Sequence, residues 1–243
     1  MDRILLEVRA GAGGDEAAIF AGDLVRMYQR FAEKTGWRFS VLDSNQTTLE
    51  GFKSLVAEIK GEGVREALQH ESGVHRVQRI PKTEKSGRVH TSTASVAVMP
   101  VVEPQEFDLN PSDLDISFFR SSGPGGQNVN KVETAVRIVH KPTGVVVASQ
   151  SGRSQSANKE SAMSMLRSKI YEEMQRMEAE KRGDMRRSQI GSGDRSEKIR
   201  TYNFPQDRVT DHRIGKKWHN IESLLEGNLE PVVKAFKKAE EEK

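Results

Sequence analysis

An acidic, proline-marked segment from Pro100 to Pro111 divides this sequence of 243 residues near its middle. Proline restricts φ and removes a backbone donor, so such a segment is typical of a connector rather than of a helix or a central strand. With 35% hydrophobic and 30% charged residues, the chain favours two or three modest domains over one large core. We therefore expect a multidomain α+β protein.

The part before this connector predicts an α/β domain. Residues 3–9 are typical of a short strand, and a helix is expected to begin near Asp15 and to end at Gly36. Its apolar residues recur at helical spacing, at Phe20, Leu24, Met27 and Phe31. Further strands are expected at 38–42, 52–59 and 89–99, with a short helix at 64–68.

The part after the connector predicts a small β-rich module with one long helix. Strands are expected at 114–119, 134–140 and 145–148, with a turn at 141–144. A helix is expected at 158–182, and its apolar stripe is expected to be core: Met163, Leu166, Ile170, Met174 and Met177. A polar, glycine-punctuated strip at 184–197 predicts a hinge, followed by strands at 199–204 and 209–214 and then helical segments.

The loop between the first two strands of that module contains the sequence Gly-Gly-Gln. Gly125 and Gly126 lack a Cβ, so their backbone can approach a ligand closely. The Gln127 carboxamide can donate and accept hydrogen bonds but cannot act as a general base. The loop is either a plain turn or a functional tip. A phosphate cradle would lead straight into a helix and contain Gly-Lys-Ser/Thr, which is absent.

Composition excludes several kinds of site. The chain has no cysteine, which removes disulfides, cysteine-bound zinc and thiol catalysis, and its six histidines lack ligand spacing, so we expect no metal and no cofactor. Residues 1–113 carry 14 basic and 17 acidic side chains, and the remainder carries 24 and 18. This excess fits either a polyanionic partner or a solvated basic face. No apolar span or signal peptide is evident, so we expect an intracellular protein that does not use a membrane.

Four further motifs accompany the Gly-Gly-Gln tip in a fixed order. They are RAGAGGDEA at 9–17, ESGVHRVQR at 71–79, HTSTA at 90–94 and RTYNFPQDRVTDHR at 200–213. With them the chain closely resembles bacterial-type class I peptide chain release factors over essentially all its residues. The resemblance implies a codon-recognition domain at 1–112, a peptidyl-tRNA hydrolysis domain at 113–187, a switch hinge at 188–197 that lets the module swing, and a C-terminal domain at 198–243 that packs on the first.

The resemblance also implies what the tip does. In that family the loop matching Gly125, Gly126 and Gln127 enters the peptidyl transferase centre of the ribosome and promotes hydrolysis of peptidyl-tRNA. Gln127 matches a residue that is commonly N5-methylated by a glutamine methyltransferase. Around the tip there is no Ser-His-Asp set and no carboxylate pair, so the ribosome is expected to complete the active site. The chain is then not a free-standing enzyme.

A second implied activity is the reading of a stop codon in mRNA. Pro81, Lys82 and Thr83 match the Pro-x-Thr motif of the type specific for UAA and UAG. By the same resemblance, Gly13 and Glu16 are expected to contact the first uridine, and Thr83 the first two bases. His90 is expected to stack between the second and third bases, and Gln78 and Thr91 are expected to hydrogen-bond the third purine. Stacking on His90 suits single-stranded RNA.

Two departures from the family pattern stand out. The usual additional N-terminal helical domain is missing before Met1, through truncation or in a naturally short member, so contacts with the class II release factor GTPase stay open. Asn128 stands where many members have His. The alternatives are a codon-independent ribosome-rescue hydrolase and a non-catalytic RNA-binding protein. The expected compartment is the cytoplasm, as for a bacterial-type factor, with an organelle matrix as the alternative.

Overall fold

The computed structural model describes residues 2–49, 51–81, 84, 86–101, 109–121, 132–191 and 193–242. The chain forms two compact units, one of Met1–Val102 with Arg182–Lys243 and the other of Glu103–Lys181. Each unit has its own sheet and its own hydrophobic cluster. The expected mixed fold with more than one domain is confirmed, and the finer domain limits remain a prediction.

The first unit is built on an eight-stranded sheet in the order β11-β10-β9-β4-β5-β1-β3-β2. Neighbouring strands are antiparallel except β4 and β9, which are parallel. The sheet therefore joins the first hundred residues to the end of the chain. Its strands are β1 (Asp2–Ala10), β2 (Arg38–Gln46), β3 (Phe52–Gly61), β4 (Gly73–Arg79), β5 (His90–Pro100), β9 (Lys198–Asn203), β10 (Arg208–Asp211) and β11 (Lys217–His219).

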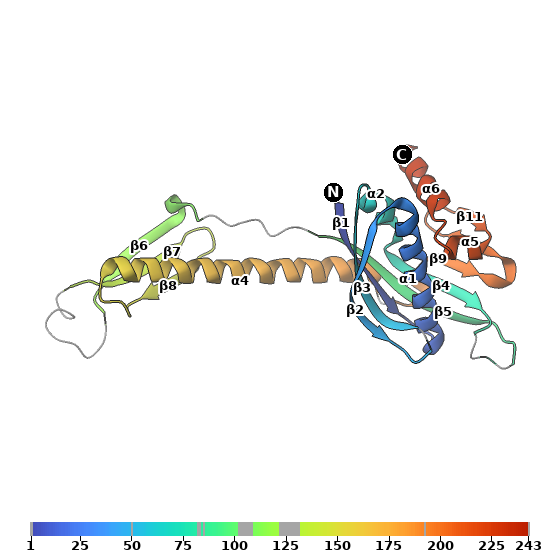
Figure 1. Ribbon diagram of the computed structural model, residues 1–243, viewed down its shortest axis with the longest axis horizontal. Helices are drawn as coiled ribbons and strands as arrows, with labels where there is room; N and C mark the ends of the chain where they lie inside the picture. The colour runs from blue at the N-terminus through green and yellow to red at the C-terminus, as the bar shows by residue number, and fades with distance from the viewer. Residues whose placement is uncertain are drawn as a thin grey trace. The chain divides into compact units, whose positions relative to one another are not determined.

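Helix α1 (Asp15–Thr35) lies across one face of this sheet (Figure 1). Its predicted apolar stripe is buried, because it packs against Ile4, Leu6 and Val8 of β1 in the main core. Gly36 ends the helix with a φ of 74°, a left-handed conformation that glycine adopts without strain. The unit also contains α2 (Val64–Leu68), η1 (Gln69–Glu71), η3 (Arg195–Glu197), η4 (Phe204–Gln206), α5 (Ile221–Leu225) and α6 (Glu230–Glu241).

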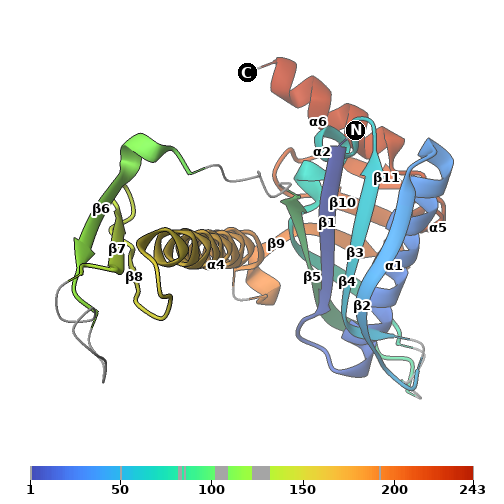
Figure 2. The same cartoon turned by 60° about the vertical axis from the view of Figure 1, so that its left-hand side comes forward.

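The second unit packs a three-stranded antiparallel sheet on one long helix (Figure 2). Inward-facing side chains of β7 and β8 meet one stripe of the helix, and this small core consists of Val136, Ile138, Val147, Ala162, Leu166 and Ile170. The elements are η2 (Pro111–Asp113), β6 (Leu114–Phe119), β7 (Ala135–His140), β8 (Val146–Ser149) and α4 (Gln155–Ile190). The residues of α4 from Arg182 onward belong to the first unit. The predicted strands and the turn at 141–144 are confirmed.

The helix α4 is longer than its predicted range of 158–182, and part of its stripe is exposed. Leu166 and Ile170 are buried as expected, but Met174 and Met177 are 41% and 52% exposed, so their assignment to the core is wrong. The strands of the small sheet have at most six residues, about 20 Å. A helix of 36 residues is about 54 Å long. Its apolar stripe therefore continues after the sheet has ended.

Seven residues of the polar strip at 184–197 are helical, 184–190, and three of them belong to the hinge predicted at 188–197. The helix continues because no proline interrupts α4 and a single glycine at Gly183 weakens a helix by only about 1 kcal/mol. The Gln189 carboxamide even accepts from the Val98 backbone N–H at 3.1 Å and donates to the Val98 carbonyl at 3.0 Å. Gly191 and Gly193 follow with positive φ values of 57° and 72°. The proposed swing of the module remains a prediction.

Candidate nucleic-acid interface

The residues expected to read the codon converge at one end of β4 and β5. The antiparallel register pairs Gln78 with Thr91 and Arg79 with His90. Residues directly opposite one another share a face of the sheet, so these two pairs lie on opposite faces. The loop that precedes α1 lies against the same end of β5. Elements that are far apart in the sequence thus bring their polar groups together here.

The loop Gly11 to Gly14 is bound directly to β5. Gly11 N–H donates to the Thr93 carbonyl at 2.8 Å, and the Thr93 N–H donates to the Ala12 carbonyl at 2.9 Å. The Ala12 N–H donates to the Thr93 hydroxyl at 2.9 Å. Gly13 has a φ of 133°, and a Cβ at this position would collide with the Ser92 side chain. Only glycine therefore allows the loop before α1 to pass this close to Ser92.

Arg79 joins the end of β4 to the first turns of α1. Its Nε donates to Glu16 Oε1 at 2.6 Å and its Nη1 donates to Asp23 Oδ2 at 2.7 Å. The guanidinium also lies over the Phe204 ring, 5.2 Å from the centroid. Burial alone would lower the pKa of Arg79, but Asp23 and Glu16 outweigh it and the pKa is raised. The buried Glu16 carboxylate is thus held by a permanent cation.

The start of α1 keeps hydrogen-bonding capacity. Glu16 Oε2 has no hydrogen-bond partner among the described residues. The N-cap residue Gly14 offers no side-chain cap, and the first N–H groups of a helix have no partner within the helix. One carboxylate acceptor and several backbone donors therefore lie at a single position.

His90 is oriented by a carboxylate. Its Nε2 lies 2.8 Å from Glu84 Oε2, and its side chain is 47% exposed. The backbone N–H of Ser86 donates to Glu84 at 2.6 Å and lowers the pKa of that carboxyl group. The imidazole is held at its edge by this contact with Glu84, and an exposed flat ring can accept a stacked base.

Of the other predicted site residues, only Pro81 lies among the described residues. Pro81 follows β4, is buried, and accepts a hydrogen bond from the Glu84 N–H at 3.0 Å. Lys82 and Thr83 lie outside the described residues. Gly125, Gly126 and Gln127 also lie outside them, as does Asn128. Their predicted roles stay predictions.

Three residues at this end of the sheet were missed by the sequence reasoning. Arg79 holds Glu16, Asn203 Nδ2 donates to Gln78 Oε1 at 3.2 Å, and Phe204 lies under the Arg79 guanidinium. All three fall within the motifs at 71–79 and 200–213, which was the available signal. Spacing could not have found the contacts, since Asn203 and Gln78 are 125 residues apart.

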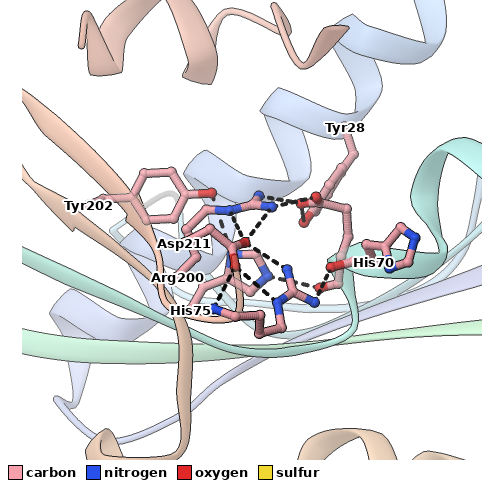
Figure 3. Close-up of polar contacts among 8 residues, drawn as sticks. Tyr28, His70, His75, Arg200, Tyr202 and Asp211 are labelled. Atoms are coloured by element: carbon pink, nitrogen blue, oxygen red, sulfur yellow. Dashed lines mark hydrogen bonds and ion pairs between the residues drawn. The ribbon is translucent and has the colours of Figure 1, made fainter. Parts of the chain in front are cut away.

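A buried polar cluster near the start of β4 fastens the C-terminal strands to the sheet (Figure 3). Arg200 is fully buried and makes two parallel hydrogen bonds to Glu71, at 2.7 and 2.8 Å, and a third to Asp211 at 3.2 Å. The Tyr28 hydroxyl donates to Glu71 at 2.9 Å. Burial alone would raise the pKa of Glu71, but Arg200 outweighs it and the pKa is lowered. The cluster thereby fixes β9, and with it Asn203, against β4.

Comparisons with known proteins agree with this geometry. The PCRF domain matches residues 1–96 and the RF-1 domain matches residues 103–213. Peptide chain release factor 1 of Acetivibrio thermocellus is 54% identical over 233 residues, which cover 96% of this chain and 65% of the relative. That of Salinibacter ruber is 50% identical over 238 residues, which cover 97% of this chain and 67% of the relative. The chain belongs to the peptide chain release factor family.

A solved release factor has the same fold. RF2 of Thermus thermophilus matches with a TM-score of 0.58 and 40% identity, over 96% of this chain and 67% of that one. The release factor chain described here spans about 65% of the length of relatives such as the Acetivibrio protein. In the described part of the chain, no helix combines the length and apolarity that a bilayer span requires.

Proposed function

We propose that the protein terminates translation: it recognises UAA and UAG in the ribosomal A site and promotes hydrolysis of the peptidyl-tRNA ester. The observation that carries this proposal is the meeting of Glu16, Gln78, His90 and Thr91 at one end of the sheet, in a chain of the release factor family. The names of its relatives, peptide chain release factor 1, support the UAA and UAG type.

Each base then meets a group of suitable chemistry. A uridine has carbonyl acceptors and one N–H donor, which suit the backbone N–H groups at the start of α1 and the buried Glu16 carboxylate, whose Oε2 has no partner among the described residues. The exposed His90 ring would stack between the second and third bases. Gln78 and Thr91 face one another and can both donate and accept, so they can serve either purine. Gly13 contributes the close approach of the loop, and Thr83 contacts the first two bases.

The hydrolytic step is assigned to the Gly-Gly-Gln sequence together with the ribosome. Gly125 and Gly126 would bring the backbone to the ester, and Gln127 would orient the attack of water without taking its proton. The partners are the decoding and peptidyl transferase centres, the stop codon, peptidyl-tRNA and a methyltransferase acting on Gln127. The bacterial cytoplasm is the proposed compartment.

The test is a release assay on ribosomes that carry labelled peptidyl-tRNA and UAA, UAG, UGA or a sense codon. Release on UAA and UAG alone is the expected result. Equal release on every codon would instead indicate a rescue hydrolase, and binding without release a non-catalytic RNA-binding protein. His90→Ala should weaken stop-codon binding about 5- to 100-fold, the range for one lost stacking contact. The exposed neighbour Val89→Ala is the matched control and should not change binding.

A further inference from the structure

Two carboxamides at the start of α4 hold the segment that leads into β7. Gln155 Nε2 donates to the Glu133 carbonyl at 3.1 Å, and Asn158 Nδ2 donates to the Thr134 carbonyl at 2.8 Å. Residues three apart lie on the same side of a helix, so one turn of α4 hydrogen-bonds two successive carbonyls, those of Glu133 and Thr134. In the sequence these groups directly follow the loop that contains Gly125 to Gln127.

Asn158 is fixed in a single orientation. Its Oδ1 accepts from the Gly152 N–H at 2.7 Å and from the Ser149 hydroxyl at 3.3 Å, while Nδ2 also donates to the Gly152 carbonyl at 3.1 Å. The residue is fully buried, and both ends of its amide are bound. A Cβ at Gly152 would lie 2.8 Å from Oδ1, so glycine is needed for this contact. The amide cannot turn without breaking several bonds at once.

The other side of the same segment meets the end of β6. The Thr134 hydroxyl donates to the Ser121 hydroxyl at 3.5 Å, and the Thr134 N–H donates to the Val132 carbonyl at 3.0 Å. Phe119 and Ala135 are the last pair of the β6–β7 ladder. Thr134 thus lies between the incoming strand and the start of α4.

We infer that Gln155 and Asn158 are positioning residues for peptide release, and we name the pair the carboxamide clamp. This inference rests on the proposed function. The clamp ties the peptide groups that follow the Gly-Gly-Gln sequence to a long helix and so sets where that sequence is presented. Orientation matters in such a step, because a misplacement of about 1 Å can slow a reaction on the order of a hundredfold.

Substitution of Gln155 can distinguish a positioning role from a general loss of stability, because its side chain is exposed and its loss removes little packing. Gln155→Glu keeps the shape but replaces the N–H donor with an oxygen that repels the Glu133 carbonyl. Gln155→Lys keeps a donor. Lys159→Gln, one turn along and also exposed, makes the same change of net charge as Gln155→Glu and controls for weaker RNA binding. Chemical denaturation of each variant should give the same unfolding midpoint as the parent, as is usual for substitutions of exposed side chains.

The measurement is single-turnover peptide release on UAA-programmed ribosomes at varied protein concentration. We expect Gln155→Glu to lower the maximal rate about tenfold. The concentration for half-maximal rate should change no more than in Lys159→Gln, and Gln155→Lys should stay within about twofold of the parent. Asn158→Leu should lower the rate further and speed amide hydrogen exchange at Thr134.

The possible results distinguish a failure of the carboxamide clamp from a failure of the proposed function. If the parent chain releases peptide and Gln155→Glu matches its maximal rate, the clamp is not a positioning device, while the proposed function stands. An equally slow Gln155→Lys would also overturn the clamp, because the donor would then be irrelevant. A parent chain that releases no peptide on any codon overturns the proposed function and the clamp together.

Discussion

Arg79 is the residue on which the start of α1 depends. It binds two carboxylates, and Glu16 is only 5% exposed. Arg79→Met removes the cation and leaves buried negative charge without a partner, which commonly costs about 3–5 kcal/mol. We expect a fall of that size in the free energy of unfolding, measured by urea denaturation, together with weaker binding to stop-codon ribosomes.

The matched control for this change is Arg26→Met. Arg26 lies 3.9 Å from Asp23, but its side chain is 56% exposed, so solvent screens the pair. Its loss should cost less than about 1 kcal/mol. If the two substitutions destabilised the protein equally, burial of the Arg79 pair would not be the cause.

The sequence predicted the type of residue at the site better than its partners. The resemblance gave Gly13 only a contact to the codon, and the structure adds a backbone reason for glycine there, because a Cβ would collide with Ser92. The contact between His90 and Glu84 and the ion pair between Arg79 and Glu16 had no signal of their own in the sequence. They depend on which strands become neighbours, and an ion pair between residues 63 apart leaves no periodic pattern.

At the scale of elements, periodicity predicted where segments begin more reliably than where their packing ends. The 3.6-residue pattern predicted α1 and its buried stripe correctly, because a broad sheet lies beneath the helix. On α4 the same pattern continues past Ile170, although the sheet that covers the stripe does not. Strand β4 was missed because its charged residues interrupt the apolar alternation, and their partners lie far away in the sequence: Arg76 contacts Thr201 of β9, and Arg79 contacts Glu16 and Asp23 of α1.

The parallel junction of β4 and β9 predicts a dependence of stability on pH. His75 is fully buried, with Nε2 2.9 Å from the Glu71 carbonyl and Nδ1 3.4 Å from the Tyr202 hydroxyl. Burial, assisted by the charge of Arg200, lowers the pKa of His75 from 6.5 to about 4. Below pH 6.5, His75 becomes protonated in the unfolded chain but stays neutral in the folded chain. The stability contributed at neutral pH is therefore lost as the pH falls from about 6.5 towards 4, by about 3 kcal/mol.

Urea denaturation between pH 7 and pH 4 measures this loss in the parent and in His75→Gln. Carboxylates such as Glu71 and Asp211, whose pKa values are lowered, also reduce stability in acid, but mainly below this window and in both proteins. The difference between the two curves therefore isolates the imidazole. His75→Gln should be less stable at pH 7 and should lose less stability on acidification. Parallel curves would contradict the assignment.

At the scale of the whole molecule, the chain crosses between its two units twice. The connector at 100–111 was predicted from its prolines and charges, and it falls where the first unit gives way to the second. The return of the chain to the first sheet after α4 could not be read from periodicity. It depends on the buried pairing of Arg200 with Glu71, 129 residues apart, and on the β4–β9 ladder. Local patterns predict the elements, whereas long-range pairing decides which unit they join.

Two separate cores predict two unfolding transitions. Among the described residues, the cluster of the second unit contains six buried residues, far fewer than that of the first, and small cores give little stability. Scanning calorimetry should therefore resolve a lower transition from the second unit and an upper one from the first. Leu166→Ala and Leu24→Ala each remove a fully buried side chain and should cost about 2–5 kcal/mol. We expect the first substitution to shift only the lower transition and the second only the upper one. One transition moved by both substitutions would instead mean that the two clusters unfold as a single cooperative unit.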